Sequence, residues 1–159
     1  MLPPHLHPRA TNYVVAVHGN TTTYMYEENG ARLVTQVLTP GHGTIFPQGS
    51  MHMMMNTGES LSHVLITKSH ATNPLLFSIK GCDNAQLVSA LDSDDAGTMN
   101  MGQVFTNGFP FELVNAAFGQ ELASEDVKSK IPPVGTGSNW GPESCLERCG
   151  VNKPEGGGQ

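Results

Sequence analysis

Three histidines on two short segments, each framed by glycine and proline, constrain this chain more than any other feature. His5 and His7 are two residues apart, so on a strand their side chains point to the same face. Pro4 and Pro8 flank this pair and favour extended backbone over helix. His52 lies in the second segment. Three imidazoles from two segments are a ligand set that can hold one divalent metal ion inside a small β-barrel.

The sequence around these histidines predicts short strands separated by turns. Runs rich in β-branched and aromatic residues predict strands at residues 12–18, 21–27, 31–38, 44–46 and 50–56. Asn29-Gly30 is a strong hairpin signal between the second and third of these strands. On the first strand, Asn12, Val14, Ala16 and His18 share one face. Many short strands with closely spaced turn signals predict an all-β sandwich or barrel.

The spacing of these residues resembles the two sequence motifs of the cupin superfamily. The first motif, His-x-His followed by Glu and Gly, matches His5, His7, Asn12 and Gly19. The second motif, with every spacing kept, matches Gly41, Pro47-Gln48-Gly49, His52 and Asn56. The string Pro-Pro-His-Leu-His-Pro-Arg-Ala-Thr at residues 3–11 is similar to germins, and Ala-Thr-Asn-Tyr at residues 10–13 is similar to fungal and slime-mould spherulin-like sequences. The chain therefore resembles the germin and spherulin-like branch of the superfamily. The resemblance to fungal sequences implies a fungal source.

This resemblance implies a fold and a metal site. The implied fold is an all-β, cupin-type double-stranded β-helix (a jelly-roll barrel), incomplete here, with short C-terminal helices. The implied ligands are His5, His7, His52 and, at the family's Glu position, Asn12. The family's site suits manganese or iron, but the Asn12 amide offers a neutral oxygen, which weakens the binding of hard cations. The oxalate oxidation and superoxide dismutation known in germins therefore do not carry over on resemblance alone.

Composition excludes several classes of function. A chain of 159 residues fits one domain, and its 18 glycines, 11 prolines and 14% charged residues suit short strands and turns. The net charge is −6 and no cluster of Lys and Arg occurs, which argues against binding to nucleic acid. No apolar run has the length of a membrane span.

The N-terminus conflicts with the resemblance, because germins are typically secreted. The first residues, Met-Leu-Pro-Pro-His, are no signal peptide, and germin-like chains carry several strands ahead of the His-x-His motif. We expect an extracellular protein whose sequence here is N-terminally incomplete; the alternative is a short cupin. Cys82, Cys145 and Cys149 form an odd set. An odd number indicates either that a fourth cysteine, the disulfide partner of one of these, lies in the missing part of a secreted protein, or that all three are free thiols in a reducing compartment.

Residues 59–81 interrupt the pattern, because without them residues 56–58 would continue directly into a spherulin-like sequence from Cys82. The segment can be encoded with a GTGAGT splice donor at residues 58–60, a CTAAC branch point at residues 71–73 and an AG acceptor at residues 80–81. One hypothesis is a retained intron translated in frame, which would pack poorly or add a strand to an open sheet edge. The alternative is an ordinary insertion. His63 and His70 lie in this segment and carry little weight as ligands.

Other candidate ligands have simpler interpretations. His42 lies in a turn and is expected to be solvated, whereas His18 is expected to line the barrel wall or a pocket. Methionines surround His52 at positions 51, 53, 54 and 55. They could form a thioether site for copper, but packing inside the barrel is the expected role.

The chain changes character towards its C-terminus. We expect the barrel at residues 1–110 and a C-terminal region at residues 111–159. Pro110 and Gly119 bound a helix at residues 111–118, and Ser124 can cap a second at residues 125–130. These resemble the helices by which germins embrace neighbouring subunits, which implies a homo-oligomer. Residues 134–159, rich in Gly, Pro and Ser, predict a mobile tail.

Three functions remain open from the sequence. The first is a manganese-dependent oxidoreductase of the germin type that acts on a small, oxygen-rich substrate such as a carboxylic acid. The second is a non-catalytic extracellular or stress-associated cupin, which the neutral Asn12 favours. The third is a gene-model product without function. The substrate is not encoded in any motif of this chain.

Overall fold

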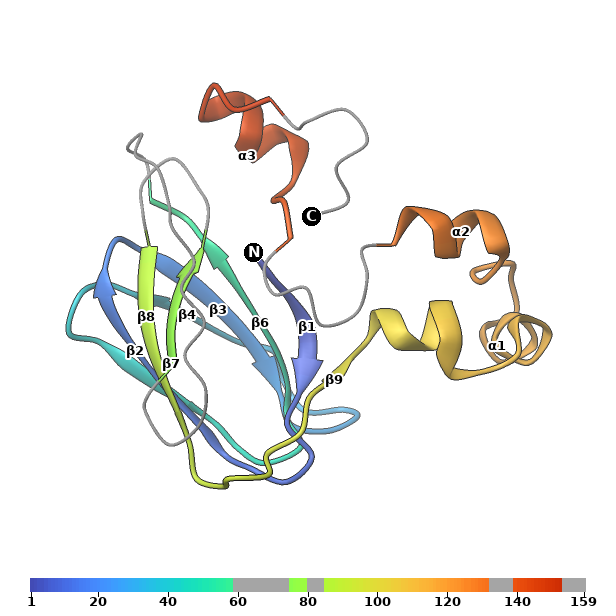
Figure 1. Cartoon of the computed structure of the whole chain (residues 1–159), viewed down its shortest axis with the longest axis horizontal. Coiled ribbons are helices and arrows are strands. Elements are labelled where there is room, and N and C mark those ends of the chain that lie inside the picture. The colour runs from blue at the N-terminus through green and yellow to red at the C-terminus, as the bar shows by residue number, and fades with distance from the viewer. Residues whose placement is uncertain (59–74, 80–84, 132–138, 153–159) are drawn as a thin grey trace.

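Nine strands form two antiparallel sheets in the computed structural model, which describes residues 1–58, 75–79, 85–131 and 139–152. The first sheet has the order β4-β3-β6-β1-β9 and the second β5-β2-β8-β7. The strands are β1 Leu2–Leu6, β2 Asn12–His18, β3 Thr21–Tyr26, β4 Val34–Leu38, β5 Gly43–Phe46, β6 Met51–Asn56, β7 Leu75–Ile79, β8 Ala85–Leu91 and β9 Met99–Asn100. Figure 1 shows the strands gathered into one body. This arrangement confirms the expected all-β jelly-roll fold.

The core lies between the two sheets and follows the alternation of strand side chains. On β2, Val14 and Ala16 are fully buried, whereas Tyr13 and Val17 face outward. The core cluster draws on both sheets and consists of Leu2, Val14, Ala16, Leu38, Phe46, Met54 and Leu87. Met54 is part of it, which confirms core packing as the role of this methionine.

The predicted turns position the strands with small shifts. β3 and β4 form the expected antiparallel hairpin, with Gly30 at φ +84°, a conformation that favours glycine. β4 begins at Val34, three residues later than the sequence suggested. The prediction for His18 is wrong. The register of β2 against β8 shifts between Ala16 and His18, and the His18 side chain is exposed instead of lining the wall.

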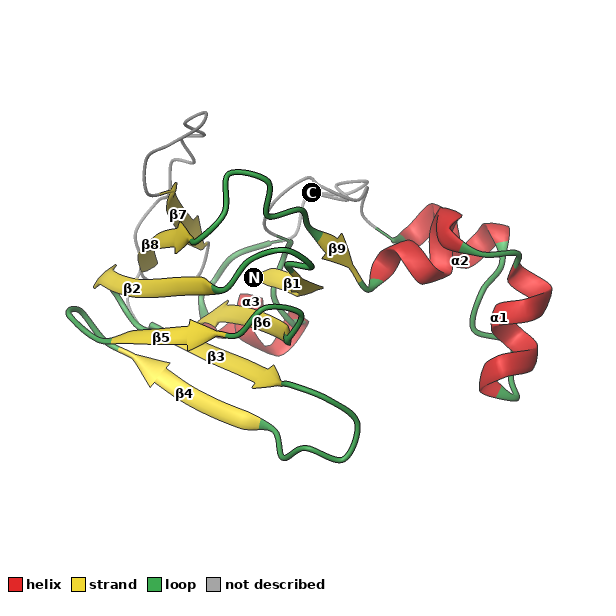
Figure 2. Cartoon of the chain, turned by 90° about the horizontal axis from the view of Figure 1, so that it is seen from below, coloured by secondary structure: helices red, strands yellow, loops and turns green. Residues whose placement is uncertain are grey.

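The helices follow the strands in the chain. Figure 2 shows α1 (Phe111–Phe118) and α2 (Glu125–Lys130) set to one side of the sheets. Both have the predicted bounds: α1 ends at Gly119 in a left-handed conformation, and the Ser124 side chain accepts a hydrogen bond from the Val127 amide. A π-helix, η1 (Val104–Gly108), precedes them and was not expected from the sequence. No helix in the described residues has the length and hydropathy needed to cross a membrane.

The expected mobile tail is partly wrong, because α3 (Glu143–Arg148) forms within it. Pro142 precedes this helix, and Glu143 and Arg148 place opposite charges at its two ends, which suits the helix dipole. Cys149 is disulfide-bonded and Cys145 is a free thiol, so the alternative of three free cysteines is wrong. Cys82 lies outside the described residues.

Only the strand β7 is described within the unexpected segment 59–81. It lies at the edge of the second sheet and pairs with β8, from Leu75 opposite Ser89 to Ile79 opposite Ala85. This matches the expectation that an apolar run of the segment adds a strand to a sheet edge. His63, His70 and the predicted splice strings lie outside the described residues.

Candidate metal centre

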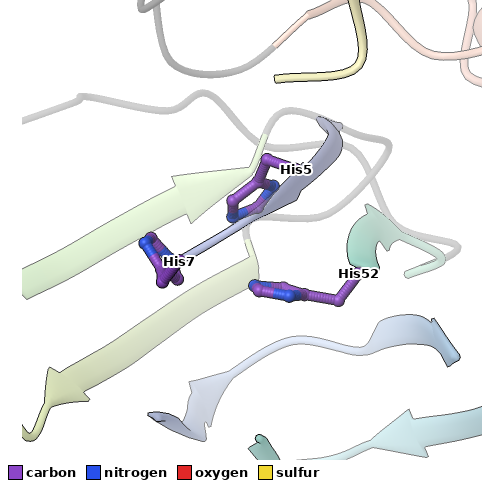
Figure 3. Close-up of side chains that lie close together, drawn as sticks. All are labelled: His5, His7 and His52. Carbon is purple, nitrogen blue, oxygen red and sulfur yellow. The ribbon is translucent and has the colours of Figure 1, made fainter. Parts of the chain in front are cut away.

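Two neighbouring strands bring the three predicted histidines together. β1 and β6 pair with His5 opposite His52, and the two ring centroids are 4.3 Å apart. His7 follows the last residue of β1, with its ring centroid 5.2 Å from that of His5 and 5.5 Å from that of His52. Figure 3 shows the three rings facing one another. Each ring offers one nitrogen, and these nitrogens all lie within 4.8 Å of one another.

Backbone carbonyl groups fix the orientation of all three rings. Each Nδ1 atom lies near one carbonyl oxygen: His5 near that of Pro3 at 2.8 Å, His7 near that of Gly97 at 2.7 Å and His52 near that of Ser50 at 3.0 Å. A carbonyl oxygen only accepts, so Nδ1 carries the hydrogen in each ring. The lone pair is then on Nε2, which is the arrangement of histidines that bind metal ions.

Burial lowers the pKa of two of these imidazoles, His5 and His52. The exposed fractions of His5, His7 and His52 are 7%, 8% and 2%. Desolvation, with a smaller contribution from the neighbouring His5, lowers the pKa of His52 to about 3. Desolvation also lowers the pKa of His5. The neutral rings of His5 and His52 are ready to bind a cation without first releasing a proton.

The Nε2 atom of His52 is a buried polar atom without a hydrogen-bond partner. Such an atom costs about 1–3 kcal/mol, so native structures rarely keep one without a reason. A metal ion bound among the three rings would satisfy it. The described residues therefore fit the metal that the sequence motifs imply.

Phe46 holds the ring of His52 from the opposite sheet. The two rings stack at 4.1 Å between centroids with an interplanar angle of 7°. Phe46 is only 1% exposed and lies at the end of β5, directly before the turn that begins with Pro47. The sequence analysis did not assign a role to Phe46, although the alternation of the predicted strand could have placed it inside.

The tight turn before β6 joins the two motif segments. Gly49 has φ +77°, and its amide donates to the carbonyl of His7 at 3.0 Å. Ser50 closes the turn, because both its amide and its hydroxyl donate to the carbonyl of Pro47. The glycine and proline of the second motif thus position the backbone of a histidine from the first.

The loop before β9 supports His7 from the other side. Besides the Gly97 carbonyl, the Thr98 hydroxyl lies 3.3 Å from the His7 Nδ1 atom. Gly97 has φ +66°, and a Cβ atom there would lie 2.8 Å from the Arg9 guanidinium. Arg9 also binds the loop through Asp95, at 2.8 Å between the two side chains. The sequence analysis did not connect Gly97 to the site.

Asn12 lies on the second sheet, at the start of β2, and is 3% exposed. Its side-chain oxygen accepts a hydrogen bond from the hydroxyl of Ser89 on β8. Asn12 pairs with Phe46, the residue that stacks on His52. The structure thus brings His5, His7 and His52 together on the first sheet and ties Asn12 to Ser89 on the second. His42 is exposed in its turn, as expected.

Comparison with known proteins places this geometry in a family. The sequence model of the family described as "Cupin" matches residues 1–79. Spherulin-1A of Physarum polycephalum is 25% identical over 151 residues, which cover 94% of this chain and 50% of that protein. A germin-like protein of Arabidopsis thaliana, subfamily 3 member 2, is 27% identical over 134 residues, covering 83% and 48%. The chain is a cupin.

A solved structure supports the same fold. An oxalate oxidase superposes with a TM-score of 0.61 at 22% identity, covering 80% of this chain and 55% of that one. The relatives named spherulin and germin-like protein confirm the predicted branch of the family. This cupin spans about half the length of the curated relatives it matches. The family and the three-histidine cluster together support a metal-binding cupin.

Proposed function

We propose that this cupin binds one divalent metal ion through the Nε2 atoms of His5, His7 and His52. The observation that carries the proposal is the buried Nε2 atom of His52, which has no hydrogen-bond partner and lies in one cluster with the imidazoles of His5 and His7. Manganese is the proposed ion, and iron is the alternative, in line with the family resemblance. Asn12 is proposed as a weak, neutral fourth ligand, as its position in the motif implies.

The protein's own contribution is to hold and shield the site. The three carbonyl contacts to Nδ1 atoms fix the rings before any ion binds, and Phe46 prevents the ring of His52 from turning. Burial limits the access of water to the cluster. A bound divalent ion would supply Lewis acidity and, for manganese or iron, one-electron chemistry.

We further propose that the reaction is the oxidation of a small, oxygen-rich substrate such as a carboxylic acid. The support is the shared fold with a protein named oxalate oxidase, together with a ligand set that leaves coordination positions open. Three protein imidazoles occupy only part of the coordination shell of manganese or iron, so a substrate oxygen can reach the ion.

A second candidate function is a non-catalytic, stress-associated or structural cupin. Asn12 favours it, because the family's charged Glu ligand is absent and metal binding is weakened. The similarity to a protein named spherulin is in line with this candidate. An extracellular location and assembly into a homo-oligomer are proposed for both candidates on the family resemblance.

Metal content and turnover, measured on the purified chain, test both functions. Elemental analysis after dialysis against manganese should find metal in the wild-type protein and none in His7→Ala. Oxygen uptake with a panel of small carboxylic acids then separates the candidates: uptake that is lost in His7→Ala supports the oxidase, and metal without uptake supports the second function. Equal metal content in wild type and His7→Ala would contradict the proposed site.

A further inference from the structure

The charge of the candidate metal centre is unbalanced. An imidazole binds a metal ion as a neutral ligand, and within the described part of the chain no carboxylate joins the three histidines. A divalent ion bound there would carry both of its charges into a buried site. Uncompensated charge in such a place is costly, and proteins normally balance it with an ion of opposite sign.

The Asn12 position is where a compensating charge would come from in the family's motif. Asn12 shares the inner face of β2 with Val14 and Ala16, and it lies beside Phe46 in the sheet. Phe46 in turn stacks on His52, so the Asn12 side chain and the cluster border the same phenylalanine. An amide at this position occupies the space of a carboxylate but brings no charge.

The hydrogen bond from Ser89 limits how strongly the Asn12 amide can bind a cation. The Asn12 oxygen is the only atom of its side chain able to bind a cation, and one of its two lone pairs already accepts the hydrogen of the Ser89 hydroxyl, which leaves Asn12 at most a weak, neutral ligand. Ser89 is itself 3% exposed, so this hydrogen bond is shielded from solvent. Asn12 therefore brings no negative charge to the centre, and the charge of a bound ion stays unmatched.

We infer that the metal ion and a small anion from solution bind this centre together, and that each raises the affinity of the other. The inference rests on the proposed metal site and adds a requirement to it: the anion supplies the negative charge that Asn12 lacks. The ligand class is a small oxygen anion such as a monocarboxylate, because hard cations prefer anionic oxygen donors. The coupling is reciprocal, since both ligands act through one binding equilibrium.

The experiment compares manganese affinity in two salts of equal ionic strength. Isothermal titration of the metal-free, full-length chain with Mn²⁺ is carried out in sodium formate and in sodium perchlorate, whose anion is a very weak ligand. Formate should raise the manganese affinity of the wild-type chain by at least about fivefold, the lower end of common coupling factors. Equal ionic strength removes general screening as a cause of the difference.

Two substitutions at one position isolate the charge. Asn12→Glu brings the carboxylate into the protein, so manganese affinity in perchlorate should rise and the formate effect should largely vanish. Asn12→Gln has the length of glutamate without its charge and should keep the formate dependence of the wild type. Thermal unfolding of both variants by circular dichroism checks that each is folded.

The outcomes separate this inference from the proposed site. Equal wild-type affinity in formate and perchlorate, with binding that His52→Ala removes, would overturn the anion requirement and leave the three-histidine site intact. A formate effect of the same size in folded Asn12→Glu and in Asn12→Gln would also overturn it. No manganese binding in either salt would overturn both proposals. If Asn12→Glu does not fold, the wild-type comparison still decides.

Discussion

Two buried polar atoms, one on each sheet of this cupin, differ in whether they have a hydrogen-bond partner. On the first sheet, the Nε2 atom of His52 is buried among the other imidazoles without a hydrogen-bond partner. On the second sheet, the buried oxygen of Asn12 is bonded to the hydroxyl of Ser89. The His52 atom on the first sheet is thus available to bind a ligand, whereas the Asn12 atom on the second sheet already takes part in a hydrogen bond that stabilises the fold.

This difference separates binding from stability. A polar atom left unpaired in the folded chain costs free energy unless a ligand pairs it, whereas a paired one already contributes to folding. Substitutions on the first sheet should therefore change metal affinity more than stability. Substitutions on the second sheet should change stability more than metal affinity.

The largest effect should come from His52→Ala. Loss of one of three ligands should lower manganese affinity by more than about 100-fold, because removal of outer-shell partners alone typically costs 10–100-fold. Titration calorimetry measures this affinity. His42→Ala is the matched control, since His42 is exposed and outside the cluster, and it should bind manganese as the wild type does. Similar losses in both variants would show that the cluster is not the site.

Ser89→Ala should show the reverse behaviour. It leaves the buried Asn12 amide without its partner and should lower the free energy of unfolding by about 1–3 kcal/mol. Manganese affinity should change less than about tenfold, the lower limit for outer-shell partners. Urea unfolding and calorimetry measure the two quantities, with the exposed Ser129→Ala as control. A large loss of metal affinity without loss of stability would break the distinction between the sheets.

Acid should destabilise the metal-free protein through the first sheet. The pKa of His52 is about 3 in the folded chain against 6.5 for an unperturbed histidine, so the unfolded state binds more protons between these values. Stability is therefore full above pH 6.5 and falls as the pH drops towards 3, by at most about 1.4 kcal/mol per pH unit for this one proton. Urea unfolding across this range measures the slope. The slope should be shallower in His52→Gln, and an unchanged slope would assign the effect to other groups.

The smallest effect should come from the helical region, away from both sheets. Ser124→Ala removes the hydrogen bond to the Val127 amide at the start of α2 and should cost about 1 kcal/mol of stability. Manganese affinity should stay at the wild-type value. A shift in manganese affinity would mean that the helices influence the metal centre, contrary to an assignment of metal binding to the first sheet alone.

Local sequence signals were enough for much of the fold. β2 at Asn12–His18 follows from its β-branched run, and α1 and α2 follow from Pro110, Gly119 and Ser124 at their ends. α3 was missed because Gly and Pro dominate its surroundings, although Pro142 and the end charges were visible signals. His18 was misplaced because strict alternation cannot foresee a register shift.

Some residues of the candidate site could also be predicted from the sequence, and others could not. His5, His7 and His52 could be identified from motif spacing, since the spacing itself encodes the turns that bring them together. Phe46 and Gly97 support these rings through contacts that link distant parts of the chain. Neither the ring stack nor the carbonyl contact leaves a local pattern in the sequence, so only the folded chain reveals them.

X-ray absorption spectroscopy of the manganese-loaded, full-length chain tests the central claim most directly. The scattering pattern of imidazole rings around the metal counts histidine ligands without reference to activity. The account predicts three imidazoles in the wild-type protein, from His5, His7 and His52, and loss of this signature in His52→Ala. A metal shell made only of oxygen, or an unchanged imidazole signal in His52→Ala, would contradict it.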